Sequence, residues 1–255
     1  MLILVYDNSF EGLLTSIYDA YYSDIKPDEI VRESLYKPNL LSEPKYIETN
    51  VVKYQKVYNA IQEKISFEAL SNIFYAYLSD LKNIDTCIYN YIKLGFKLSK
   101  NLTLYVHDDT VMKIDKTVRK VTWESTRMLG FVRFKCITDI IKNNIDNTVY
   151  YSSIEPDHNI LILIADHFAK RLSNENWIIH DIKRETAVFY NKKDWIITPF
   201  TRNNEKKLNS KCDEEFYENL WRDYFKSTAI DERKNPKLQK NHMPLRYWKH
   251  LTEIN

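Results

Sequence analysis

DTVMKIDKTVRKVTWESTRMLGFVRFKC, residues 109–136, contains the change of periodicity on which the expected fold depends. Up to Leu129 the apolar residues recur every three or four positions, which predicts a long helix over 109–129. After Gly130 the side chains alternate with a period of two, which predicts a strand. We therefore expect a mainly helical region over residues 1–129 and an α+β region over residues 130–255.

The chain that follows Gly130 repeats short strand patterns around one helical pattern. Because most of these strands follow each other through short turns, we expect an antiparallel sheet with the helix covering one face, in a protein of the α+β class. The expected elements are a strand at 131–136, a strand at 148–154, a helix at 158–172, and strands at 177–180, 186–190 and 195–198.

The chain that precedes this stretch is mostly helical. Leu2–Tyr6 predicts a short buried strand, and Phe10–Tyr22 predicts a helix with one apolar side. The pattern from Val51 to Leu94 predicts two or three antiparallel helices, and Gly95 is typical of a helix C-cap. A weaker pattern near residues 30–35 predicts a short strand or helix. Another near residues 45–50 predicts a strand.

The C-terminus combines a helical pattern with a basic and aromatic segment. A helix is expected from Asp213, and residues 221–255 hold eight Lys and Arg against four Asp and Glu. Asn235-Pro236 and Met243-Pro244 predict extended or turn conformations. The apolar residues among them favour an ordered tail, with Arg233, Lys237, Lys240 and Arg246 turned to solvent or to a ligand.

Composition excludes several classes of function. The three glycines are dispersed, which excludes a P-loop and a dinucleotide-binding fingerprint. The three cysteines form no CxxC pair, so we expect no zinc or iron–sulfur site, no metal and no cofactor. The apolar run at the N-terminus is too short for a signal peptide or a membrane span, which favours a cytoplasmic protein without membrane contact.

A basic stripe with one tryptophan follows the helix predicted over 109–129. Cations neutralise phosphates and an aromatic ring can stack on an exposed base, so the stripe is typical of a surface that lies along a nucleic acid. The alternative is a solvated face whose tryptophan packs on a neighbouring element. The stripe consists of Lys113, Lys116, Lys120, Trp123 and Arg127.

Titratable side chains suggest few catalytic groups. His107-Asp108-Asp109 and His158 fall at expected helix starts, where acids are typical caps. His167 shares a helix face with Arg171, and His180-Asp181 ends a strand three residues before Arg184. Hydrogen-bonded histidines at the edge of the core are one interpretation. The other is a site built from His167, His180, Asp181 and Arg184.

Five segments together resemble a bacterial family named "probable DNA metabolism protein", a domain of unknown function. The longest is the final motif, which resembles the family over 34 residues. The segments are YDNSFEGLLTSIYDAY at 6–21, STRMLGFVRF at 125–134, IEPDHNIL with DHFAKRL across 154–172, WIIHDIKRETAVFY at 177–190, and LWRDYFKSTAIDERKNPKLQKNHMPLRYWKHLTE at 220–253.

The resemblance implies a nucleic-acid context with a radical-SAM protein of DNA modification or repair as partner. Some related proteins carry a uracil-DNA-glycosylase-like domain, which we do not expect here because the chain ends after the final motif. Two hypotheses follow: a DNA-binding or adaptor protein, or a DNA-processing enzyme of nuclease or base-excision type around His167, His180, Asp181 and Arg184. The expected nucleic-acid-binding residues are Arg127, Arg133, Arg171, Arg184, Arg222, Arg233, Lys237, Arg246, Tyr247 and Trp248.

Overall fold

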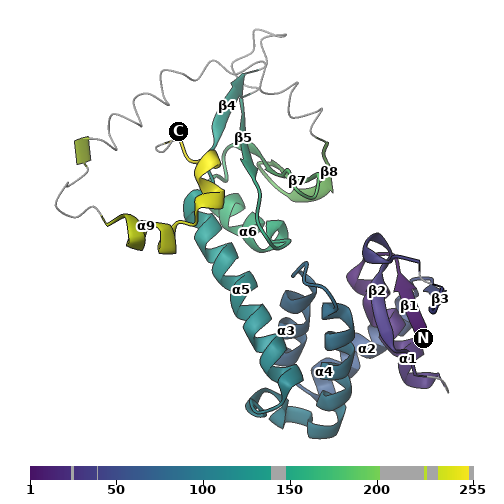
Figure 1. The fold of residues 1–255 in the computed structure, drawn as a ribbon. Helices are drawn as coiled ribbons and strands as arrows, with labels where there is room; N and C mark the ends of the chain where they lie inside the picture. Colours follow the sequence, from purple (N-terminus) through teal and green to yellow (C-terminus); the bar gives the residue numbers. More distant parts are fainter. Residues whose placement is uncertain (24–25, 39, 139–147, 202–226, 229–234, 253–255) are drawn as a thin grey trace. The chain divides into compact units, whose positions relative to one another are not determined.

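The computed structural model describes the whole chain except residues 24–25, 39, 139–147, 202–226, 229–234 and 253–255. It confirms the α+β class, with helices packed on two separate sheets (Figure 1). The chain divides into two compact units, Met1–Thr122 and Trp123–Asn255, which we name the N-terminal and C-terminal units. The helix expected from Asp213 lies mainly outside the described residues.

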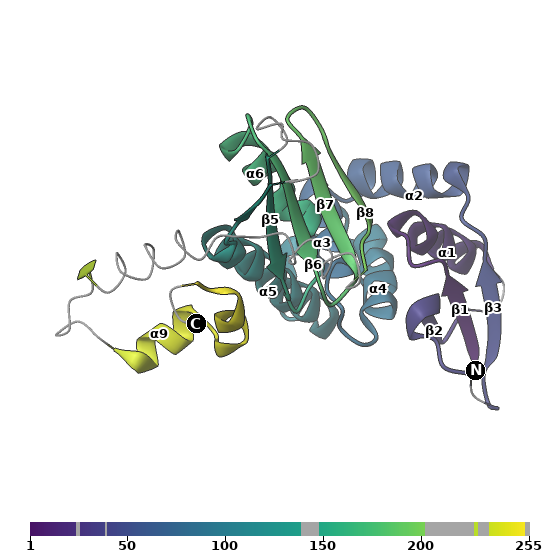
Figure 2. The same cartoon turned by 90° about the horizontal axis from the view of Figure 1, so that it is seen from above.

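The N-terminal unit begins with a three-stranded parallel sheet. β1 (Leu2–Tyr6) lies between β2 (Glu29–Arg32) and β3 (Glu43–Ile47) and runs parallel to both (Figure 2). The helix α1 (Phe10–Tyr22) follows β1 and has the bounds that its sequence predicts. Ser9 caps it, because its Oγ accepts a hydrogen bond from the backbone N–H of Gly12 at 2.8 Å.

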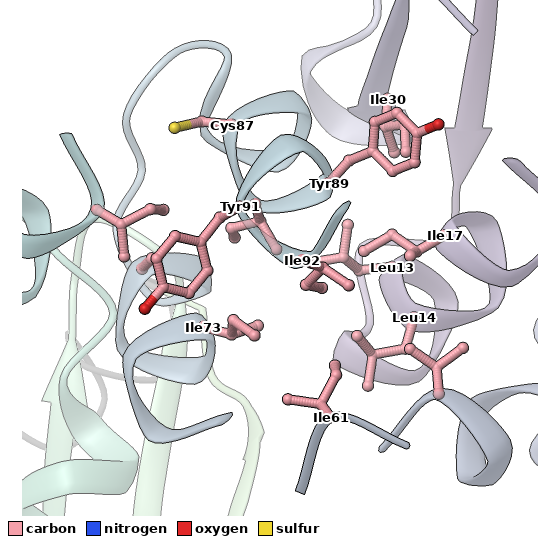
Figure 3. Close-up of a cluster of buried hydrophobic side chains, with 14 of the residues drawn as sticks. Leu13, Leu14, Ile17, Ile30, Ile61, Ile73, Cys87, Tyr89, Tyr91 and Ile92 are labelled. Carbon is pink, nitrogen blue, oxygen red and sulfur yellow. The ribbon is translucent and has the colours of Figure 1, made fainter. Parts of the chain in front are cut away.

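Helices pack around the apolar side of α1 to complete the core of this unit. Leu13, Leu14 and Ile17 of α1 meet isoleucines of the other helices in a continuous buried cluster (Figure 3). Burying each large side chain of this kind contributes about 1.5–3 kcal/mol. The remaining elements are the 3₁₀ helix η1 (Glu33–Leu35), α2 (Val51–Lys64), α3 (Phe67–Tyr77), α4 (Ile84–Leu98) and the 3₁₀ helix η2 (Ser99–Leu104).

Gly95 does not end a helix as its sequence context predicts, since α4 continues through it to Leu98. The structural reason for glycine is close packing. A Cβ at this position would lie 2.5 Å from Cδ1 of Ile65 and 2.9 Å from Cδ2 of Leu102. The absence of a side chain therefore lets α4 approach these two residues.

The long helix α5 (Asp109–Phe131) runs from one unit into the other. Asp108 caps it, as expected for an acid at this place, because its Oδ1 accepts from the backbone N–H of Thr110 at 2.8 Å. The helix continues two residues beyond the predicted end. The first strand of the second sheet, β4 (Lys135–Thr138), therefore starts later than the alternation from Phe131 indicates.

The sheet of the C-terminal unit has the predicted β-β-α-β-β-β order, but it is not antiparallel throughout. Neighbouring strands pair in the order β4-β5-β6-β7-β8, and the last four of them are labelled in Figure 2. The central pair β5 and β6 is parallel, because α6 returns the chain between them, while the other pairs are antiparallel. The bounds are β5 (Thr148–Ile154), α6 (Leu161–Arg171), β6 (Asn176–Asp181), β7 (Thr186–Asn191) and β8 (Trp195–Pro199).

The two faces of this sheet hold different side chains. Trp177 of β6 is fully buried, and its ring lies 6.3 Å from that of Phe168 on α6 and 5.1 Å from that of Tyr190. The opposite face holds a second apolar cluster that includes Tyr151, Ile178 and Phe200. The alternation of side chains along each strand separates the two sets.

The described part of the C-terminal tail forms two short helices, and Asn235, before the first of them, has the extended backbone predicted for the residue before a proline. Asn235 accepts from the backbone N–H of Leu238 at 3.0 Å and caps α9 (Pro236–His242), so the proline occupies the first helical position, where its missing N–H costs nothing. The 3₁₀ helix η6 (Leu245–His250) follows. Tyr247 and Leu251 are buried, whereas Leu238 and Leu245 are about half exposed.

Candidate functional site

The parallel strands β5 and β6 end side by side, with Ile154 paired to Asp181. In sheets of this kind, ligand sites form outside the carboxyl ends of parallel strands. Polar and charged side chains from four different elements meet at this edge of the sheet. We name them the carboxyl-end cluster, which consists of Glu124, Asp157, Asp181, Arg184, Arg246 and Tyr247.

Glu124 on α5 is the centre of this cluster, and only 4% of its surface is exposed. Its two carboxylate oxygens accept from the backbone N–H groups of Asp157 and His158, at 2.9 and 2.8 Å. The hydroxyl of Tyr247 also donates to the carboxylate. One acid thus connects α5, the loop after β5, and the tail.

Arg246 adds a cation at the solvent side of the same group. Its Nη2 lies 3.6 Å from Oε1 of Glu124 and 3.0 Å from Oδ2 of Asp157, and it donates to the Tyr247 hydroxyl at 2.9 Å. Burial raises the pKa of Tyr247, and the hydrogen bond to the Glu124 carboxylate raises it further. The phenol is therefore a proton donor throughout the physiological range.

Asp181 and Arg184 form a second buried pair, which spans the turn between β6 and β7. Nη1 of Arg184 lies 2.6 Å from Oδ2 of Asp181, whose surface is fully buried. Nη2 of the same arginine donates to the carbonyl of Asp157 at 2.7 Å. Burial raises the pKa of Asp181, while the Arg184 guanidinium opposes this shift. The pair therefore links the turn between β6 and β7 to the loop that follows β5.

Two histidines lie on the sheet face opposite α6. Nδ1 of His180 is 2.9 Å from the hydroxyl of Tyr151, and Nδ1 of His250 is 3.3 Å from Oγ of Ser153. His180 is fully buried on β6, and His250 ends η6. The second contact attaches the tail to β5, the neighbour of the central strand β6.

We expect the docking of η6 to weaken in acid. Burial lowers the pKa of His250, and the neighbouring Lys249 lowers it further, while Glu155 opposes the shift. The unfolded chain then binds a proton at about pH 6.5 that the folded chain does not, so stability falls as the pH falls below that value. Urea unfolding of wild type and His250→Gln between pH 5 and 8 measures this, and the variant should show the shallower pH dependence. An equal slope in both proteins would contradict the assignment.

The structure brings together only part of the predicted catalytic group. His180, Asp181 and Arg184 follow each other at the end of β6, but His180 and Asp181 are fully buried. His167 lies on the exposed side of α6, a helix that leads away from the carboxyl end of β5. The four side chains therefore do not line a common cleft.

The predicted nucleic-acid-binding residues are distributed over several environments. Arg171 and Lys237 are exposed, Arg133 donates to the carbonyl of Gly130 at 2.7 Å, and Trp248 donates to that of Met243 at 2.8 Å. The buried ring of Tyr247 packs 5.6 Å from that of Phe131, so it has no free face for a base. Arg184 and Arg246 belong to the carboxyl-end cluster. Arg222 and Arg233 lie outside the described residues.

A basic surface with an exposed tryptophan remains in the C-terminal unit. Trp123 is 62% exposed on α5, so the residues that the structure describes leave most of its surface uncovered. One turn later, Nη2 of Arg127 donates to the carbonyl of Asn241 at 3.5 Å, which places α9 beside this helix. Lys237 and Lys240 are exposed on α9. We name Trp123, Arg127, Lys237 and Lys240 the Trp–Arg surface.

Two kinds of site find no support in the described ranges. No group of three or more His, Cys, Asp or Glu residues in these ranges is placed to hold a metal ion. None of the helices described here combines the length and the apolar character needed to cross a membrane.

Glu124 is the central group that sequence reasoning did not single out. Its position in the helix contains a usable signal. It lies three residues after Val121 and four before Met128, so it occupies the apolar stripe of α5, where both neighbours are buried. A carboxylate on the core-facing side of a helix requires buried partners.

The fold and this cluster define an α+β protein whose C-terminal unit is a mixed sheet closed at its carboxyl end by its own tail. A family model described as a domain of unknown function, DUF4130, matches residues 82–253, and the chain belongs to this family. The match begins before α4 and includes the whole carboxyl-end cluster. No curated protein matches the chain.

Proposed function

We propose that this protein binds DNA with unpaired bases through the Trp–Arg surface and acts as a non-catalytic adaptor. The observation that carries the proposal is the exposure of Trp123 one turn from Arg127, which contacts the helix α9 that holds Lys237 and Lys240; no carboxylate in the described residues forms an ion pair with these three cations. A large exposed ring in a basic surface suits a base, because stacking needs a free aromatic face and the phosphates need positive charge.

The distribution of buried groups favours an adaptor over an enzyme. Arg184 neutralises the buried Asp181, and Nδ1 of His180 is hydrogen-bonded to the hydroxyl of Tyr151. A nuclease or glycosylase around His167, His180, Asp181 and Arg184 would need these groups to face a shared cleft. The enzyme alternative therefore has less support.

A radical-SAM enzyme of DNA modification or repair completes the proposal as the partner. This part rests on the resemblance of the five sequence segments alone. Copurification of the two proteins, with and without damaged DNA, is the measurement that addresses it. An absence of any complex under both conditions would remove the partner from the proposal and leave the DNA-binding part unchanged.

Replacing Trp123 by alanine should weaken binding to a fluorescein-labelled single-stranded oligonucleotide about tenfold, because one stacking contact is lost. The double change Lys237→Gln and Lys240→Gln should reduce the magnitude of the slope of log K against log salt by about 1.4, since two phosphate contacts disappear and each contributes about 0.7 on a single strand. Fluorescence anisotropy at a series of salt concentrations measures both effects.

A matched control for these variants lies elsewhere on the same unit. Lys192 and Lys193 are exposed at the turn between β7 and β8, and changing both to glutamine removes the same charge. This control should leave the affinity and the salt slope close to wild type. If the control weakens binding as much as the α9 variant, the Trp–Arg surface is not the DNA-binding site.

A further inference from the structure

A pocket of about 410 Å³ lies between α1, α2 and α4 of the N-terminal unit. Its wall consists of aromatic rings with two lysines at its edge. This volume falls in the lower part of the range that small-molecule sites occupy. The side chains used below are Tyr18, Tyr21, Tyr22, Phe96, Lys56 and Lys64.

The aromatic rings form one continuous wall. The Tyr22 ring lies 4.6 Å from that of Tyr18 and 5.4 Å from that of Tyr21, and Tyr21 lies 6.1 Å from Phe96. Tyr22 is 71% exposed and Tyr21 is 53% exposed, although both are large apolar surfaces. Rings held in place by each other and open on one side are suited to stack on a flat aromatic ligand.

The two lysines of the pocket are available for an anion. Lys56 and Lys64 are exposed on α2, and neither forms an ion pair with any residue in the described part of the chain. Nζ of Lys56 lies 5.8 Å from the centre of the Tyr18 ring, so the lysine ammonium group is close to the aromatic side of the pocket. Lys53 differs, because Asp19 binds its Nζ at 2.6 Å.

A second groove on the other side of α2 has the opposite charge. It has a volume of about 360 Å³ and is also aromatic, with Tyr54, Phe67 and Tyr75 in its wall, but its charged group is Glu11. Burial raises the pKa of Tyr54, and the Glu11 carboxylate raises it further. This acidic groove disfavours a phosphate and serves as an internal comparison.

We infer that the pocket between α1, α2 and α4 binds a nucleotide, with the base stacked on the exposed ring of Tyr22, which Tyr21 meets edge to face, and the phosphate beside Lys56 and Lys64. The inference is independent of the proposed function. The pocket lies within Met1–Thr122, whereas the Trp–Arg surface lies within Trp123–Asn255. Most of the pocket also lies before residue 82, outside the match to the family.

The test uses thymidine 5′-monophosphate with the full chain and ligand-observed saturation-transfer NMR. We expect saturation of the thymine protons, an affinity that falls about tenfold in Tyr22→Ala, and a loss in Lys64→Gln. Thymidine without the phosphate should bind more weakly than the nucleotide. Tyr75→Ala in the acidic groove and Lys45→Gln on β3 are the matched controls and should bind as wild type.

Crosslinking with 5-iodo-2′-deoxyuridine locates the base, and it distinguishes a free nucleotide from a nucleotide within a DNA strand as the ligand. The iodinated base is supplied either as the 5′-monophosphate or within a short oligonucleotide, and the modified peptide is identified by mass spectrometry. Crosslinks to Tyr21 or Tyr22 support the inference, and the better substrate shows whether the pocket takes a free nucleotide or one within a strand. Absence of saturation transfer, or equal losses in the two control variants, would overturn it.

Discussion

Replacing Glu124 by alanine is expected to lower the free energy of unfolding of the C-terminal unit by about 3–5 kcal/mol, since the change breaks a buried, charged network. The backbone N–H groups of Asp157 and His158 lose their acceptor, and so does the hydroxyl of Tyr247. Urea unfolding followed by tryptophan fluorescence reports this unit, because all five tryptophans lie between residues 123 and 248.

A matched variant on the same helix separates this network from a general effect of charge. Asp115 forms an exposed pair with Arg119 at 3.1 Å, and changing it to alanine should cost less than about 1 kcal/mol. Glu124→Gln keeps one oxygen acceptor and should fall between the two. If Glu124→Ala unfolds at the same urea concentration as Asp115→Ala, the carboxylate does not hold the tail to the carboxyl-end loops.

Replacing Asp85 by alanine should destabilise the N-terminal unit by a similar amount, about 3–5 kcal/mol, because Arg32 would remain buried without its counter-charge. The Arg32 guanidinium binds both carboxylate oxygens of Asp85 at 3.0–3.3 Å, and it lies 4.6 Å from the centre of the Tyr77 ring. Asp85 is 3% exposed. Far-UV circular dichroism during urea unfolding records the loss of the helices of this unit.

The neighbouring Asp80 provides the control, because it contacts the same arginine from a more exposed position. Its Oδ1 lies 3.8 Å from Nη1 of Arg32, so Asp80→Ala should cost less than about 1 kcal/mol. The double change Arg32→Met and Asp85→Leu removes both charges and should recover stability relative to Asp85→Ala. A double variant that is less stable than Asp85→Ala would show that the ion pair itself contributes net stability.

Local sequence features account for the elements that were predicted well. The helix Phe10–Tyr22, the cap at Asp108 and the order of strands after Gly130 depend on the period of apolar residues and on groups within a few positions of each other. Such interactions are local, so the sequence by itself determines them. The α+β class follows from the same patterns.

Tertiary contacts decided the features that were not predicted. The parallel pairing of β5 with β6 follows from the return of the chain through α6, and glycine at position 95 serves the packing of Ile65 against α4. In both cases the partner lies in an arrangement that a strand or helix pattern alone does not specify. The helix start at Asn235-Pro236 is different, because it depends on a local contact: Asn235 accepts from the backbone N–H of Leu238, three residues later.

The candidate sites show the same division. Sequence alone indicated the basic stripe with Trp123, since its members recur at helical spacing. Only the tertiary structure decided that Trp123 stays exposed and that Glu124 receives hydrogen bonds from residues 33 to 123 positions away. It also decided that Tyr21 and Tyr22 line one pocket with the lysines of α2. The physical reason is that burial and charge pairing depend on which distant segments come into contact, whereas periodicity depends only on neighbours in the chain.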